Sequence, residues 1–88
     1  MRLAAALRPH ADGASSLDVD VAPPVTVAAV IEAVAVAHPA VGRRIRDESG
    51  ALRRHVNVFV GADAVRDPSG TLVPEAAEVT VLPAVSGG

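Results

Sequence analysis

The residues best suited to take part in a reaction are the last two of the sequence, Gly87 and Gly88. Glycine has no Cβ, so a Gly-Gly end can lie extended and enter a channel that is too narrow for other residues. The preceding residues 78–82 alternate between polar and apolar side chains, as a β-strand does. A strand followed by such a tail would present the carboxylate of Gly88 as a reactive group.

An idle tail is the competing interpretation. Chain ends are commonly disordered, and glycines at such positions often have no role. Two terminal glycines alone therefore carry little information, and the rest of the chain must decide between the two interpretations.

Composition excludes several classes of function. The chain has 88 residues, from which we expect one small domain (1–88) with residues 84–88 as a flexible reactive tail. It has no Cys, which excludes disulfides, thiolate metal sites and a cysteine nucleophile. A net charge of −2 without Tyr or Trp argues against nucleic-acid binding. We find neither a signal peptide nor an apolar run that could cross a membrane, so we expect a cytoplasmic protein.

Periodicity predicts one helix and several strands. Residues 26–38 have helical spacing, with Thr26 as N-cap and Pro39 closing the helix. A short helical turn is expected at 43–47. Alternation predicts strands at 1–8, 16–21, 52–60, 65–66 and 78–83, the first two as a hairpin.

This element order predicts an α+β fold. A single helix must bury its apolar stripe on one face of a sheet, here a mixed sheet of four to five strands. We expect the first and last strands to lie side by side in the centre of the sheet, which would anchor the tail on rigid structure.

Alternation also assigns side chains to the two faces of the sheet. The core face takes the valines of the last two long strands: Val56, Val58, Val60, Val79 and Val81. Phe59, the only aromatic residue, and Leu82 then lie on the opposite face. An exposed Phe and Leu on adjacent strands would form a docking patch for a partner protein. The alternatives are that a loop covers Phe59 or that the register is shifted by one residue.

Other polar residues suggest less. The three histidines lack metal-ligand spacing, so we expect no metal site: His10, His38 and His55. Five arginines between positions 43 and 54 could form a basic patch for an acidic partner, although a solvated rim with interleaved Asp47 and Glu48 is the preferred interpretation. Asp18 and Asp20 are assigned to solubility and edge protection.

The whole pattern resembles the ubiquitin-like β-grasp sulfur carriers. These include the small subunit of molybdopterin synthase, the thiamine sulfur carrier and the cysteine-biosynthesis sulfur carrier. The resemblance rests on residues 78–88, with support from Thr26-Val27, His38-Pro39 and residues 55–60. The charged stretch 52–54 looks closest to the cysteine-type carriers.

One turn departs from the pattern of that family. The carriers usually have an acidic, glycine-containing turn before the last strand, whereas this chain reads Glu75-Ala76-Ala77-Glu78. Alanine disfavours positive φ, so this turn must differ in geometry or carry strain.

The resemblance implies a protein cosubstrate rather than an enzyme, or the small subunit of a two-subunit sulfurtransferase. An ATP-dependent partner would adenylate the carboxylate of Gly88 and convert it to a thiocarboxylate, which an acceptor biosynthetic enzyme would use as sulfur donor. Gly87, Ser86 and Val85 would enter the partner's active site. The chain would bind no cofactor itself and would be a monomer when free. Two alternatives stay open: a ubiquitin-like modifier conjugated through Gly88, and a plain interaction domain with an idle tail.

Overall fold

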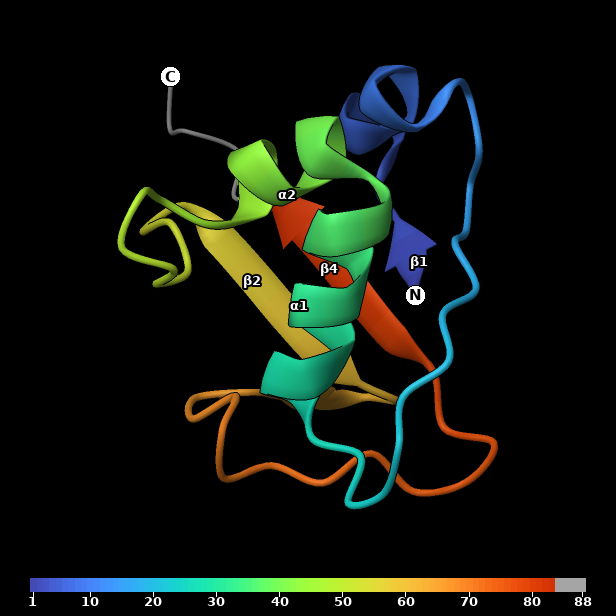
Figure 1. Ribbon diagram of the computed structural model, residues 1–88, viewed down its shortest axis with the longest axis vertical. Coiled ribbons are helices and arrows are strands. Elements are labelled where there is room, and N and C mark those ends of the chain that lie inside the picture. Colours follow the sequence, from blue (N-terminus) through green and yellow to red (C-terminus); the bar gives the residue numbers. More distant parts are fainter. Residues whose placement is uncertain (84–88) are drawn as a thin grey trace.

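The computed structural model describes residues 1–83, which form a mixed four-stranded sheet with helices on one face (Figure 1). The strands are β1 (Arg2–Leu3), β2 (Val56–Val60), β3 (Asp63–Ala64) and β4 (Val79–Pro83), in the order β1-β4-β2-β3. β4 runs parallel to β1 and antiparallel to β2. The α+β architecture and the pairing of the first strand with the last are therefore confirmed. β1, however, lies at the edge of the sheet and not in its centre.

The long helix forms where the sequence predicts it. α1 (Val27–Ala37) starts at Thr26, whose side-chain Oγ1 accepts a hydrogen bond from the Ala29 amide at 3.1 Å. That bond satisfies one of the free amides of the first turn. Buried Val27, Val30, Ile31 and Val34 form the stripe that faces the sheet, so packing compensates for the weak helix propensity of the β-branched residues.

A second helix, α2 (Pro39–Ile45), was missed by the sequence prediction, which placed only a turn at 43–47. Pro39 was assigned the role of ending α1, but proline is also favoured at the first position of a new helix. α2 crosses closely over α1 at the buried Gly42. A Cβ at Gly42 would lie 2.7 Å from the Cβ of Ala35, so only glycine permits this approach.

The predicted strand over residues 1–8 is wrong beyond Leu3. The chain instead forms a 3₁₀ helix, η1 (Ala5–Ala11), which buries Leu7 and Ala11. The hairpin ladder stops at the same place. Amides of Leu3 and Leu17 bond the carbonyls of Ser15 and Met1, and residues 18–21 form no strand, because their partner has turned into η1.

The remaining strands are shorter or displaced. β2 begins at Val56 and not at residue 52; Leu52 forms an isolated bridge with Arg46 instead. β3 occupies Asp63–Ala64, two residues before the predicted short strand at 65–66. β4 agrees with the predicted strand to within one residue.

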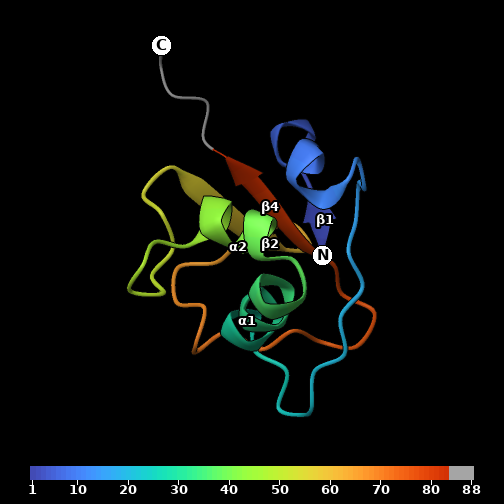
Figure 2. The same cartoon turned by 45° about the horizontal axis from the view of Figure 1, so that its top comes forward.

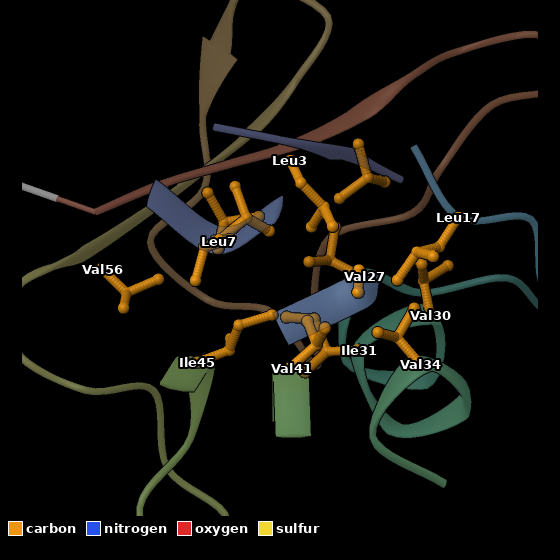
Figure 3. Close-up of a cluster of buried hydrophobic side chains, with 14 residues drawn as sticks. Leu3, Leu7, Leu17, Val27, Val30, Ile31, Val34, Val41, Ile45 and Val56 are labelled. Carbon is orange, nitrogen blue, oxygen red and sulfur yellow. The ribbon is translucent and has the colours of Figure 1, made fainter. Parts of the chain in front are cut away.

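The core is a single cluster of small and medium aliphatic side chains between the sheet and the helices (Figure 3). It receives residues from η1, both α-helices and three strands, and the sheet contributes Leu3, Val56, Val58, Val79 and Val81. These valines lie on the face that alternation assigned to the core. No charged or polar side chain among residues 1–83 is buried.

The turn before β4 has the strain that its composition indicated. The Ala77 amide bonds the Pro74 carbonyl at 3.0 Å, and Ala76, the third residue of this turn, has a φ of 68°. Type II turns place a positive φ at this position, where glycine is the usual residue.

Replacing Ala76 with Gly is expected to raise the free energy of unfolding by up to about 1 kcal/mol. The substitution relieves roughly 1–2 kcal/mol of left-handed strain, which exceeds the added chain entropy of the unfolded state. Urea denaturation measures the effect. Ala62, exposed and without positive φ, is the matched control: Ala62→Gly should destabilise. Equal destabilisation by both substitutions would contradict the strain argument.

Candidate functional site

The end of β4 is the rigid base from which the last residues of the chain depart. β4 is paired on both sides: Val81 aligns with Leu3 of β1 and Val58 of β2, and Pro83 aligns with Val56. The Ala4 amide adds a bond to the Val81 carbonyl at 3.2 Å. The backbone up to Pro83 is therefore held in a sheet ladder, as the reactive-tail hypothesis requires.

The predicted reactive residues follow directly after this base. Gly88, Gly87, Ser86 and Val85 all lie outside the described residues, which end at position 83. Their roles stay predictions.

The sheet face opposite the helices carries Phe59 and Leu82. In the β2–β4 register, Phe59 lies opposite Thr80 and Leu82 lies opposite Asn57, so the four side chains share one face. Phe59 and Leu82 are diagonal neighbours across the two strands, a separation that an aromatic side chain can bridge. Leu82 is 39% exposed, whereas Phe59 is half-buried and thus less open than the sequence suggested.

The histidines have separate positions. His38 lies between the two helices and is both the C-cap of α1 and the N-cap of α2. His10 and His55 line a cleft together with arginines. Among residues 1–83, no three His, Asp or Glu side chains lie close enough to hold a metal ion.

The loop between α2 and β2 is organised by Asp47. Its Oδ1 accepts bonds from the Ser49 amide at 2.9 Å, the Ser49 hydroxyl at 2.6 Å and the Ala51 amide at 3.1 Å. The hydrogen bond from the Ser49 side chain is the main reason why the pKa of the Asp47 carboxyl lies below its ordinary value, with a smaller contribution from the charge of Arg53. This carboxylate is thus committed to its own loop.

Comparison with known proteins decides the family. The model of the ThiS family matches residues 1–88. The chain belongs to the ThiS family. As a sulfur carrier of this family it is a protein cosubstrate rather than an enzyme.

Individual relatives agree with this assignment. Sulfur carrier protein CysO of Mycobacterium tuberculosis (strain ATCC 25618 / H37Rv) is 37% identical over 86 residues, which cover 93% of this chain and 89% of the relative. The crystal structure of SAMP1 from Haloferax volcanii has a TM-score of 0.85 at 33% identity and covers 99% of this chain and 94% of its own. These matches establish the ubiquitin-like β-grasp fold.

A third relative was solved with another protein. The crystal structure of the Amycolatopsis orientalis BexX/CysO complex contains a chain with a TM-score of 0.82 and 30% identity, covering 99% of this chain and 96% of its own.

Within residues 1–83 of the present chain, no helix has the length and apolar character needed to span a bilayer.

Sequence reasoning missed the cleft beside α2. Its walls come from η1, α2 and the residues before β2, and neither of the two helices was predicted. One signal was present: Val41 and Ile45 have helical spacing directly after a proline that can start a helix.

Proposed function

We propose that the chain carries sulfur as a thiocarboxylate on Gly88 and donates it to a biosynthetic acceptor enzyme. The observation that supports this most strongly is the position of β4: a strand paired on both sides leads directly into the Gly-Gly end of a ThiS-family chain. The domain would act as a handle, and the chemistry would take place in partner active sites.

The proposed activation has two steps. A carboxylate oxygen of Gly88 attacks the α-phosphate of ATP on an activating enzyme, and pyrophosphate leaves. A sulfide-level nucleophile then attacks the acyl carbon, the bond to AMP breaks, and the thiocarboxylate remains. In this scheme the chemistry is confined to the carboxylate of Gly88, and no side chain of this chain has to transfer a proton.

Docking of the folded part is assigned to the face that carries Phe59 and Leu82. These side chains lie on the two central strands, and β4 leads from this face to the tail. Val85, Ser86 and Gly87 would occupy the entrance channel of the partner. The same partner could then contact this uncharged patch, because β4 connects the patch to the tail.

The acceptor is proposed to be an enzyme of cysteine biosynthesis. Similarity to proteins named CysO favours this acceptor over those of molybdopterin, thiazole or secondary metabolites. A CysO chain in complex with BexX is also among the similar structures, so a protein similar to BexX belongs among the partners to be tested.

Mass spectrometry tests the proposed function directly. When the chain is co-expressed with its adenylating enzyme, the intact mass is expected to increase by the difference between one sulfur and one oxygen, and fragmentation should place the change on Gly88. The same chain expressed without that enzyme is the control. A terminus that stays unmodified beside a demonstrably active enzyme would refute the proposal.

A ubiquitin-like modifier is the second candidate, and the similarity to SAMP1 favours it. Another solved structure of that type is described as small archaeal modifier protein 1. The chain has no Lys and so cannot accept an isopeptide bond on a side chain of its own, although it could be attached to other proteins. Conjugates of higher mass on immunoblots, lost when Gly88 is removed, would support this candidate.

A further inference from the structure

A basic cleft of about 440 Å³ lies between η1, α2 and the residues that lead into β2. Its lining contains one apolar residue and five that carry or can carry positive charge: Ala40, with His10, Arg43, Arg44, Arg53 and His55. No Asp or Glu side chain lines it. In a chain with net charge −2, this is a local separation of charge.

Topology places this cleft at the end of the sheet from which the tail departs. β1 is parallel to β4, so η1, which follows β1, lies where β4 ends. β2 is antiparallel to β4, so His55, directly before β2, lies at that end as well; the next residue, Val56, aligns with Pro83. Figure 1 shows η1, α2 and the arrowhead of β4 in the upper part of the molecule, and in Figure 2, where this part is turned forward, α2 lies in front of β2.

The ion pairs among residues 1–83 do not involve the side chains of the cleft, although Asp47 and Glu48 line a neighbouring hollow together with Arg43 and Arg53. Ion pairs there join Arg2 to Glu78 and Arg46 to Glu32, both outside the cleft lining. Asp47, three residues after Arg44, uses its carboxylate to hold its own loop.

Helix stabilisation explains only part of the cluster. Arg43 and Arg44 lie in the last turn of α2, where positive charge interacts favourably with the helix dipole. The half-buried Arg53 donates from Nε to the Arg43 carbonyl at 2.8 Å, which fixes its guanidinium beside the helix. His10 and His55 come from other elements and have no part in that effect.

A free phosphate or nucleotide fits the cleft poorly. Sites for such anions commonly use backbone amides at a glycine-rich loop or convergent cations. Here Arg43, Arg44 and His55 are exposed and spread along an open wall. A broad set of exposed cations matches a surface of carboxylates on a protein, where such charges accelerate and orient association.

We propose that this cleft is the electrostatic docking site for an acidic rim around the tail entrance of the activating enzyme. The inference rests on the proposed function, because the same partner must receive residues 84–88 and thereby cover this end of the domain. The uncharged Phe59/Leu82 patch and the basic cleft would then have different roles in binding. The patch would supply contact area, and the cleft would raise the association rate and orient the two proteins.

Charge reversal tests the inference. Arg43→Glu and Arg44→Glu are compared with Arg66→Glu, at another exposed arginine, in the loop after β3; all three variants change net charge by the same amount. Thiocarboxylation kinetics should show at least a tenfold increase in KM for each cleft variant, little change in kcat, and less than a twofold change for Arg66→Glu. The effect should shrink from low to high salt, since a Debye length of about 8–10 Å screens such charges. Two-dimensional NMR spectra confirm that each variant is folded.

The outcomes are distinct. Equal KM increases in all three variants would indicate a general charge effect and overturn the inference, as would unchanged KM in the cleft variants. A titration with AMP or inorganic phosphate alone serves as a further arm: saturable shifts of the cleft amides at micromolar concentrations would identify a small-anion site and overturn the protein-docking assignment. If the native chain is never thiocarboxylated, the proposed function fails and this inference fails with it. A thiocarboxylated native chain with unaffected cleft variants refutes this inference alone.

Discussion

Deleting Gly87 and Gly88 is expected to abolish thiocarboxylate formation, with a loss of at least about a hundredfold, the scale on which misplaced reactive groups lose rate. The truncated chain would end on Ser86, and its carboxylate would stop about 7 Å short of the reactive position, since an extended residue spans about 3.3–3.6 Å. Mass spectrometry after co-expression with the adenylating enzyme measures the loss.

Stability separates this effect from a folding defect. The fourteen core residues of the described part lie between Leu3 and Val81, so the deletion removes none of them. The free energy of unfolding should therefore stay within about 0.5 kcal/mol of the native value.

A length-preserving variant, Gly87→Ala with Gly88→Ala, is the matched control because it keeps the reach and adds only two Cβ atoms. It should retain part of the activity if length matters and lose activity if a narrow channel requires glycine. A deletion variant that is still thiocarboxylated would contradict a role for the terminal glycines.

The elements that the sequence predicted well are those in which local pattern and tertiary packing agree. α1 has a side-chain cap at Thr26 and an apolar stripe of the right period, and both survive in the structure. β4 has strict alternation and is buried on one face only, so Val79 and Val81 turn inward and Leu82 outward.

The N-terminal segment was predicted wrongly because its pattern fits two structures. Leu3 and Leu7 can share one face of a strand, but they are also four residues apart, as in a helical turn. Pairing decides between them: β1 finds β4 as partner for only two residues, and the chain then forms η1 over the end of the core. Local sequence contains no information about where a partner strand ends.

The candidate site likewise has parts that the local sequence pattern predicts and parts that it does not. Alternation was sufficient to place Phe59 and Leu82 on one face, and the terminal glycines needed no structure to be noticed. The basic cleft could not be predicted, because it joins His10, Arg43 and His55 from three elements whose proximity depends on the parallel pairing of β1 with β4. The sequence offered two interpretations of the arginines, a solvated rim with interleaved Asp47 and Glu48 and a basic patch for an acidic partner, and neither of them included His10 or His55.

Replacing Ile45 with Ala is expected to lower the free energy of unfolding by about 2–5 kcal/mol, the range for large-to-small changes at buried sites. Ile45 is completely buried and is the largest such side chain in the described core, to which α2 contributes it beside Val41 (Figure 3). The buried core of the described residues consists of Val, Leu, Ile and one Ala, and contains no Met or Phe that could fill the cavity. Urea denaturation at constant m measures the change.

Val36→Ala on α1 is the control, because Val36 is 72% exposed and its truncation should change stability by no more than about 0.5 kcal/mol. A small effect at Ile45 would show that α2 packs loosely, and α2 would then be a poor support for Arg43 and Arg44.

A large effect of Ile45→Ala on stability has a consequence for function as well. Small domains commonly have only about 5 kcal/mol of stability, so Ile45→Ala would leave a substantial unfolded fraction at elevated temperature. Thiocarboxylation of that variant should then fall with the folded fraction, and it should recover when the assay is cooled, whereas the loss in the Gly87–Gly88 deletion should persist at every temperature.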